Sequence, residues 1–254
     1  MAKTVFITGA SSGIGRALAM ELAGRGYDLF LTARRLDALE QVRSEVASSH
    51  PGRTVHVRAL DVTDDDAVVA VLEEAASALG RVDIVVANAG VSNSGRVGAN
   101  TARARLIIET NLMRAVATVE AAVALFRRQG GGHIVGVASV AGMRGLPGSS
   151  SYSASKAGLM VYLDAVRAET AGEPIKVTTL APGYIDTPLN QDIKSRPFLI
   201  DADAGARQMA DLIERGVGYA TVPRLPWSVL APLMRVLPAS VIARGAPQRD
   251  APAS

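Results

Sequence analysis

The sequence predicts an α/β fold, with a doubly wound parallel sheet in a single domain and an apolar C-terminal extension. Short apolar runs typical of strands alternate with helical patterns through most of the 254 residues. The runs are continuously apolar, as strands are when helices cover both faces of their sheet. Repeated strand–helix–strand units with right-handed crossovers produce this arrangement. We place the domain that contains this sheet at 1–224 and the extension at 225–254.

The predicted strands and helices follow one another without an internal repeat or a low-complexity linker. In a doubly wound sheet, or Rossmann fold, ligands bind outside the carboxyl ends of the strands. Residues that follow each strand are therefore the candidates for a site. The predicted strands lie at 5–7, 29–31, 55–57, 84–86, 133–137 and 175–180, and the predicted helices at 13–23, 36–47, 65–79, 99–128 and 151–170.

A glycine-rich loop, TGASSGIG at 8–15, follows the first strand. Glycines let the chain turn tightly and let its backbone approach a pyrophosphate, which then meets the N-terminus of the next helix. Ser11 and Ser12 can donate hydroxyl hydrogen bonds to the phosphates. A glycine loop alone is a weak signal, but its position after the first strand favours a dinucleotide site. The candidate cofactor-binding residues of this loop are Gly9, Ser11, Ser12, Gly13, Ile14 and Gly15.

The second strand ends near Ala33, and Arg34 and Arg35 follow it. A site that prefers NAD places a carboxylate here for the ribose hydroxyls, whereas the nearest acid, Asp37, already belongs to the next predicted helix. Because an arginine can bind a phosphate through two parallel hydrogen bonds, the pair predicts a 2′-phosphate and hence NADP(H), with NAD(H) as the alternative. The other interpretation is that both arginines lie on a solvated helix start.

Three further strand ends carry residues that suit the same cofactor. The Asp61 carboxylate could accept a hydrogen bond from an adenine amino group, and small residues after the fourth strand would let the backbone approach closely. Each segment could instead be an ordinary turn, and their placement at successive strand ends is what favours binding. The candidates are Asp61, Val62, Asn88, Ala89, Gly90, Pro182, Gly183, Ile185 and Thr187.

The candidate catalytic residues centre on Tyr152 and Lys156, which are four apart in a predicted helix and project from one face. A tyrosine alone has a pKa near ~10. An ammonium beside it stabilises the phenolate, so we expect the tyrosine pKa to fall towards neutral pH. Ser139, a short loop upstream, would hold a substrate carbonyl or alcohol against the tyrosine. The pair alone fits an ordinary surface helix equally well, because YxxxK often occurs by chance.

Taken together, these motifs resemble the short-chain dehydrogenase/reductase family, in its group of single-domain enzymes of about 250 residues. The resemblance covers Lys3 to about Thr187. Occurring together and in order, the motifs are far more specific than YxxxK. They are TGASSGIG at 8–15, LDVTD at 60–64, NAG at 88–90, Asn111, Ser139, YSASK at 152–156 and PGYIDTP at 182–188.

The resemblance implies a role for each catalytic candidate. Tyr152 would be the general acid in reduction and the general base in oxidation. Lys156 would bind the nicotinamide ribose and lower the tyrosine pKa, while Ser139 would polarise the substrate carbonyl. Asn111, an unfavourable residue inside a predicted helix, would hold a water that links Lys156 to bulk solvent. The residues implied for the nicotinamide carboxamide are Ile185 and Thr187.

The predicted function is an oxidoreductase that transfers a hydride between NADP(H) and a hydrophobic carbonyl or secondary alcohol. A non-catalytic dinucleotide-binding regulatory module is the alternative, but a sensor would not need the tyrosine–lysine pair. An epimerase or dehydratase fits poorly, because only about 70 residues follow Pro182. The candidate residues around the substrate are mostly apolar, which favours a hydrophobic compound. They are Val140, Met143, Leu146, Pro147, Tyr184, Leu189 and Phe198.

Composition argues against several other classes. There is no cysteine, hence no disulfide or thiolate chemistry, and His50, His56 and His133 lack the spacing of metal ligands, so we expect no metal. The net charge is +3 with dispersed arginines, which is a weak basis for nucleic-acid binding. No apolar run reaches the roughly 20 residues of a membrane span, and the N-terminus lacks the features of a signal peptide. We therefore expect a cytoplasmic protein.

The C-terminal part departs from the family pattern. Many members end with a strand and an aspartate-glycine-glycine signature that builds a tetramer interface, whereas this chain continues YATVPRLPW at 219–227. We therefore expect a homodimer and do not assume a tetramer.

The segment 226–242 is rich in apolar residues that something must cover. Pro232 and Pro238 disfavour one long amphipathic helix. The substrate cleft, a second subunit and a membrane surface are the possible partners, and membrane binding is the least favoured because only three cations flank the segment. We hypothesise that the segment packs beside the helix after Asp201, as a wall of the substrate pocket and part of a dimer contact. The flanking cations are Arg224, Arg235 and Arg244.

Overall fold

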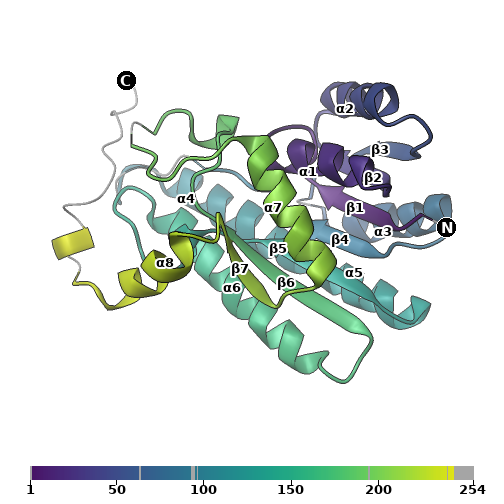
Figure 1. Ribbon diagram of the computed structural model, residues 1–254. Coiled ribbons are helices and arrows are strands. Elements are labelled where there is room, and N and C mark those ends of the chain that lie inside the picture. The colour runs from purple at the N-terminus through teal and green to yellow at the C-terminus, as the bar shows by residue number, and fades with distance from the viewer. Residues whose placement is uncertain are drawn as a thin grey trace.

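The computed structural model describes residues 2–62, 64–92, 95, 97–193, 195–238 and 240–242 (Figure 1). Seven parallel strands form one sheet in the order β3-β2-β1-β4-β5-β6-β7. The predicted doubly wound parallel sheet is therefore confirmed. The strands are β1 (Thr4–Thr8), β2 (Asp28–Ala33), β3 (Val55–Ala59), β4 (Ile84–Ala87), β5 (Gly132–Val137), β6 (Ile175–Pro182) and β7 (Tyr219–Val222).

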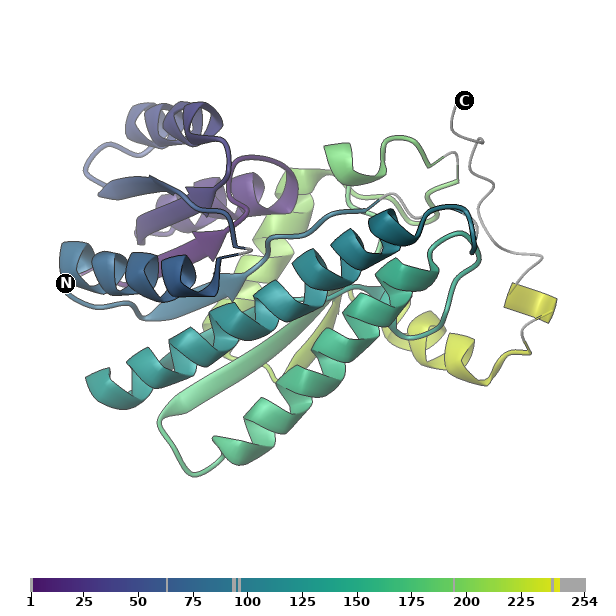
Figure 2. The ribbon, with the colours of Figure 1, turned by 180° about the vertical axis from the view of Figure 1, so that it is seen from behind.

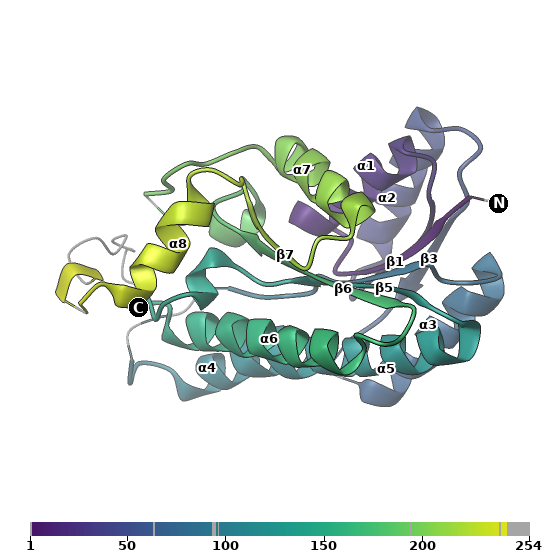
Figure 3. The ribbon, with the colours of Figure 1, turned by 60° about the horizontal axis from the view of Figure 1, so that its bottom comes forward.

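Helices cover both faces of this sheet, which explains why its strands are continuously apolar (Figures 2 and 3). On one face α1 (Gly13–Gly24), α2 (Leu36–Ser49) and α7 (Ala202–Arg215) share one hydrophobic cluster with the strands. On the other face α3 (Asp65–Leu79), α5 (Arg114–Gln129) and α6 (Ser150–Glu169) share a second cluster. Two shorter helices, α4 (Thr101–Ile108) and α8 (Trp227–Val236), extend beyond the carboxyl edge of the sheet (Figure 3).

The chain reverses its direction across the sheet between β1 and β4, which are neighbours although two strands separate them in sequence. The connection after β1 crosses to one face and the connection after β4 crosses to the other. A crevice therefore opens at the carboxyl ends of these two strands.

The prediction of a single helix over 99–128 was wrong in one respect. After α4 the chain makes a π turn, Glu109–Met113, before α5 begins. In this turn the N–H of Arg114 bonds to the carbonyl oxygen of Glu109, five residues earlier, in place of the usual four. Such wide turns inside helices are rare and often occur at functional sites. Asn111 lies within the turn and is fully buried.

The C-terminal part differs from the sequence analysis in two ways. First, β7 provides a final strand, which pairs with β6 from Thr179↔Tyr219 to Pro182↔Val222, although no strand was predicted at 219–222. Second, α8 continues through Pro232 and ends before Pro238. Proline removes one backbone hydrogen bond, and tertiary packing of the buried Trp227 and Ala231 compensates for it.

The segment 226–242 does not pack where we expected. Its buried residues form a cluster with Val140, Met143 and Tyr184, which flank the site described below, and not with α7. Residues 243–254, which include the flanking cation Arg244 and the predicted tail, lie outside the described part of the chain. No helix in the described residues is both long enough and apolar enough to cross a bilayer.

A buried histidine on β5 links the stability of the sheet to pH. His133 Nε2 lies 2.8 Å from the hydroxyl oxygen of Thr178 on β6. That hydroxyl donates its own proton to the carbonyl oxygen of Val217, so the imidazole is the donor. Burial, with a smaller effect of the Lys176 charge, lowers the pKa of His133 from 6.5 to about 4.

We therefore expect acid to destabilise the fold through His133. A depressed histidine pKa means that the folded state disfavours the proton, so the stability is complete above pH 6.5 and is lost as the pH falls towards 4. Between pH 7.5 and 5 this contribution should fall by about 2 kcal/mol. In urea unfolding, His133→Gln should lose that much less stability than the wild type over the same interval. An equal loss in both proteins would contradict the assignment.

Candidate active site

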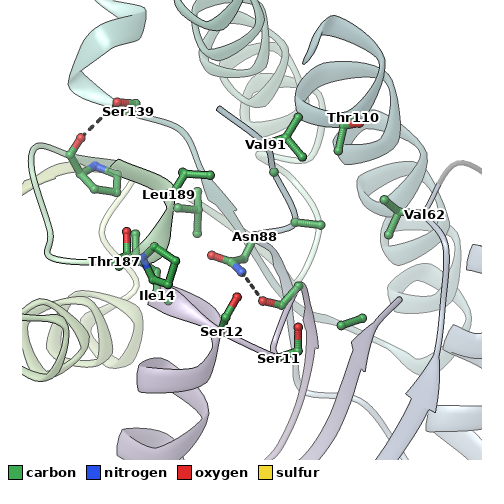
Figure 4. A pocket seen from close by; sticks show the side chains of 18 of the residues that line it. Ser11, Ser12, Ile14, Val62, Asn88, Val91, Thr110, Ser139, Thr187 and Leu189 are labelled. Carbon is green, nitrogen blue, oxygen red and sulfur yellow. Dashed lines mark hydrogen bonds between the residues drawn. The ribbon is translucent and has the colours of Figure 1, made fainter. Parts of the chain in front are cut away.

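A cavity of about 760 Å³ lies along the carboxyl edge of β1, β2, β4, β5 and β6. It gathers nearly all the predicted site residues, although they come from segments as distant as 9 and 187. Figure 4 shows Ser11 and Ser139 at opposite ends of the view, with Asn88 between them. The predicted residues that line it are Gly9, Ser11, Ser12, Gly13, Ile14, Arg34, Arg35, Asp61, Val62, Asn88, Ala89, Gly90, Ser139, Tyr152, Lys156, Pro182, Gly183, Ile185 and Thr187.

The glycine loop needs its glycines for two different reasons. Gly9 and Gly13 have φ of 69° and 56°, in the left-handed region that favours glycine. Gly15 does not line the cavity but holds α1 against the loop. A Cβ added there would lie 2.4 Å from the carbonyl oxygen of Gly9 and 2.6 Å from the Asn88 amide nitrogen. At Gly9 and Gly13 the loop therefore presents backbone without a side chain to the cavity, which allows the close approach that a pyrophosphate needs.

Hydrogen bonds in both directions fix the glycine loop to the end of β4. Of the two side chains that form them, Asn88 was predicted from the sequence and Thr8 was not. The Asn88 amide donates to the carbonyl oxygens of Thr8 (2.9 Å) and Gly9 (3.2 Å). In return the Thr8 hydroxyl oxygen accepts from the backbone N–H groups of Asn88 and Ala89. The Asn88 amide thus orders the glycine loop from β4. Thr8 was quoted as part of the loop motif, but its partner on another strand cannot be read from local sequence.

At the β2 end, Arg34 and Arg35 lie at the junction with α2 and are exposed. Within the described residues neither guanidinium forms an ion pair, whereas Arg16, Arg43 and Arg58 all pair with glutamates. The first turn of α2 carries an acidic residue, Asp37, but Asp37 does not line the cavity. This end of the cavity is therefore positively charged and free to take an anion.

At the β5 end, Lys156 is buried and its ammonium group donates a 2.8 Å hydrogen bond to the carbonyl oxygen of Val137. The Nζ atom lies 5.9 Å from the centre of the Tyr152 ring. Burial lowers the pKa of Lys156 to about 8. The side chain therefore remains mostly protonated at neutral pH. The helical spacing thus brings a tyrosine and a buried cation together in the cavity, as predicted from the sequence.

Ser139 begins the short 3-10 turn Val140–Gly142 and accepts a hydrogen bond from the N–H of Ala141 at 3.2 Å. Its hydroxyl donates to the carbonyl oxygen of Pro182 at a rather long 3.3 Å. Rotation of this hydroxyl exchanges that weak bond for a bond to another acceptor in the cavity. The serine is therefore suitably placed to polarise a carbonyl group.

Asn111, the other predicted catalytic residue, does not line the cavity but lies just behind it. Its side chain accepts from the N–H of Val91 at 2.7 Å and donates to the carbonyl oxygen of Val91 at 2.9 Å. It therefore holds the segment after β4. A Cβ added to Gly90 would lie 3.2 Å from Asn111 Oδ1 and 3.6 Å from Lys156 Nζ, so the three residues are close neighbours.

The predicted substrate residues separate into two groups. Leu189 lines the cavity and is 40% exposed, whereas the other predicted residues do not line it. Val140, Met143 and Tyr184 pack together around Trp227 of α8, and the Phe198 ring meets the same indole edge-on. From the sequence, Trp227 was assigned to the C-terminal segment, which was expected to form a wall of the substrate pocket beside α7. Only the packing of α8 reveals its position.

In the described part of the chain, no group of three or more histidine, aspartate or glutamate side chains could hold a metal ion. The polar groups around the cavity are instead glycine-loop amides, hydroxyls, the side-chain amides of Asn88 and Asn190, two arginines, one buried ammonium and the single carboxylate of Asp61. This set fits a phosphate-bearing dinucleotide, with donors for a pyrophosphate at the loop and cations at the β2 end.

Comparisons with known proteins agree with this architecture. A family profile described as short chain dehydrogenase matches residues 3–197. An uncharacterized oxidoreductase of Mycobacterium tuberculosis is 40% identical over 236 residues, covering 92% of this chain and 93% of the relative. Levodione reductase is 28% identical with a TM-score of 0.78, covering 86% of this chain and 94% of that one. An alcohol dehydrogenase from the archaeon Thermococcus sibiricus, solved with 5-hydroxy-NADP, is 28% identical with a TM-score of 0.79, covering 87% and 96%.

Proposed function

Because this chain belongs to the short-chain dehydrogenase family, we propose that it transfers a hydride between NADP(H) and a hydrophobic ketone, aldehyde or secondary alcohol. Tyr152 is the proton donor in reduction and the acceptor in oxidation. One observation carries the proposal: a single cavity holds Ser139, Tyr152 and Lys156 at one end and Arg34 at the other.

Each catalytic side chain has one task in this proposal. The Tyr152 hydroxyl gives its proton to the substrate oxygen as the carbonyl is reduced. The Lys156 ammonium favours the phenolate that remains, because an opposite charge nearby stabilises the ionised form. Ser139 turns its hydroxyl from Pro182 to the substrate oxygen and orients it. A bound nicotinamide supplies the hydride.

Lys156 and the π turn at Asn111 return the proton to Tyr152. The side-chain amide of Asn111 already hydrogen-bonds to the backbone N–H and carbonyl oxygen of Val91. We therefore assign the water that links Lys156 to bulk solvent to the backbone of the π turn. A π turn breaks the regular pattern of helical hydrogen bonds, which leaves backbone groups for such a water. Gly90 leaves space for the path, because a side chain there would stand between Asn111 and Lys156.

The preference for NADP(H) rests on the β2 end of the cavity. Arg34 and Arg35 line it without carboxylate partners in the described residues, and a 2′-phosphate would supply the missing charge. The structural relative from Thermococcus sibiricus was solved with an NADP derivative, which supports the same type of cofactor here. The residues proposed for the nicotinamide carboxamide are Ile185 and Thr187.

A non-catalytic dinucleotide-binding module remains the alternative, and turnover separates the two. With NADPH and a panel of alkyl ketones, aldehydes and quinones, we expect oxidation of NADPH, followed at its absorbance band, in proportion to enzyme concentration. NADPH binding without oxidation of the cofactor by any member of the panel would favour the regulatory module.

We further propose a homodimer, to which the outer face of α8 contributes. Three apolar residues of α8 are exposed although the same helix contributes to a well-packed cluster: Val229, Leu233 and Val236. Sedimentation velocity measures the assembly directly. A monomer at micromolar concentration would contradict this assignment.

A further inference from the structure

Trp227 is the only tryptophan of the chain, and it lies directly behind the wall of the cavity. It begins α8 and is 6% exposed. Its Nε1 atom lies against Gly183, which lines the cavity: a Cβ added to Gly183 would be 2.2 Å from that nitrogen. Glycine at 183 is therefore required for the indole to occupy this place.

The indole N–H of Trp227 has no hydrogen-bond partner within the described residues, although it is buried. Leaving a buried donor unsatisfied costs about 1–3 kcal/mol, and such groups are rare in native proteins. Val140, Met143 and Leu230 of the surrounding cluster are apolar, and the hydroxyl of Tyr184, the only phenol in the cluster, forms no hydrogen bond with Nε1. An unsatisfied indole N–H that is retained next to a cavity, despite this cost in folding free energy, indicates that a bound ligand supplies the acceptor.

The position of the indole relative to Ser139 suggests what that acceptor is. Val140, which packs against Trp227, directly follows Ser139. Gly183, which Nε1 touches, directly follows Pro182, whose carbonyl oxygen accepts from the Ser139 hydroxyl. Both neighbours of the indole, Val140 and Gly183, thus directly follow a residue of the Ser139–Pro182 hydrogen bond. The unpaired N–H therefore lies close to the hydroxyl that is proposed to hold the reacting carbonyl.

We propose that Trp227 determines substrate specificity by donating a hydrogen bond from Nε1 to a second oxygen of the substrate. This inference rests on the proposed function. It narrows the substrate class to apolar carbonyl compounds that carry a further acceptor, such as a ketone, ester or ether oxygen, a few bonds from the reacting carbon. A site that hydrogen-bonds one substrate group discriminates strongly against analogues that lack this group.

Phe198 provides the route by which a substrate reaches the indole. Its ring meets the Trp227 ring edge-on, with the centroids 5.7 Å apart, yet the residue is 51% exposed. It is also the only non-glycine residue in the described part of the chain with a positive φ, 58°. That conformation is unfavourable for a residue with a Cβ, so its surroundings, and not backbone preference, hold Phe198 beside the indole. A substrate that displaces this half-exposed ring would gain access to the indole.

A matched pair of substrates tests the proposal: an alkyl methyl ketone and an acetoacetate ester of the same chain length. Trp227→Phe keeps an aromatic ring but removes the N–H. We expect kcat/KM with NADPH to fall about tenfold for the ester and to change less than about twofold for the ketone. Ser228→Ala, at an exposed position next to Trp227 in the same helix, should change neither. Equal changes for both substrates in Trp227→Phe would overturn the proposal.

A spectroscopic measurement does not depend on turnover or on the folding of a tryptophan variant. In Tyr152→Phe loaded with NADP⁺, the single tryptophan reports on its own N–H. Addition of the ester should shift its fluorescence to longer wavelength as the donor gains an acceptor, and the ketone should not. The absence of this shift at saturating ester would also overturn the proposal. If the wild type reduces no carbonyl compound but the shift is observed, the proposed reaction fails and the binding role of Trp227 stands.

Discussion

Replacement of Tyr152 by phenylalanine is expected to lower kcat/KM by about a thousandfold while leaving the affinity for NADPH nearly unchanged. In the proposed function the phenol gives its proton to the substrate oxygen, whereas the Ser139 hydroxyl only orients that oxygen. In the proposed function the phosphates of the cofactor would be held elsewhere, at the glycine loop and the β2 end of the cavity, whose residues line it. Stopped-flow single turnovers with a reducible ketone separate this chemical step from cofactor binding and release.

Tyr162 provides a matched control on the same helix. Its hydroxyl hydrogen-bonds to Glu120 on α5, and it does not line the cavity. Tyr162→Phe should therefore keep the wild-type turnover while removing an equal phenolic group from α6. A single-turnover rate of Tyr152→Phe within a few-fold of the wild type would exclude Tyr152 as the proton donor. NADPH affinity, measured by fluorescence, should agree among all three proteins.

The sheet and the glycine loop could be predicted from the sequence because their signals are local. A buried parallel strand is apolar on both faces, and a loop that approaches a phosphate needs glycine wherever a Cβ would collide. The Tyr152–Lys156 pair is local in the same sense, since four residues make one helical turn. Arg34 and Arg35 could be found because they directly follow a strand whose position was predicted.

The features that were missed depend on contacts between distant segments. Thr8 becomes important only because β1 and β4 are neighbours, which places its hydroxyl at the N–H groups of Asn88 and Ala89. The edge strand β7 is only four residues long and gains its hydrogen bonds from β6. The π turn at Asn111 replaces a regular helical turn that local propensity could not distinguish from it.

The position of Trp227 beside the cavity also depends on contacts between distant segments. From the sequence, the two prolines of 226–242 disfavoured a continuous helix and the segment was assigned to a wall beside α7. The structure instead begins α8 at Trp227 and carries it through Pro232, because Trp227 and Ala231 are buried against Val140. No spacing rule connects residue 227 with Gly183. The collision that a side chain at 183 would cause is visible only in three dimensions.

Replacement of Arg34 by alanine is expected to lower the ratio of kcat/KM for NADPH to that for NADH by about tenfold to a hundredfold. A guanidinium–phosphate contact is a charge-assisted hydrogen bond worth about 1.5–3 kcal/mol, and only NADPH carries the 2′-phosphate that would receive it. Arg43→Ala is the control, because that arginine lies on α2 and pairs with Glu40 away from the cavity.

The same change should also alter the dependence of NADPH binding on salt. An exposed ion pair is screened as ionic strength rises. Added salt should therefore weaken NADPH binding less in Arg34→Ala than in the wild type, while NADH binding responds equally in both proteins. An unchanged cofactor ratio in Arg34→Ala, with a reduced ratio in Arg35→Ala, would transfer the phosphate contact to Arg35. If neither variant changes the ratio, the positive charge at the start of α2 does not select NADP(H), and the cofactor preference proposed here is wrong.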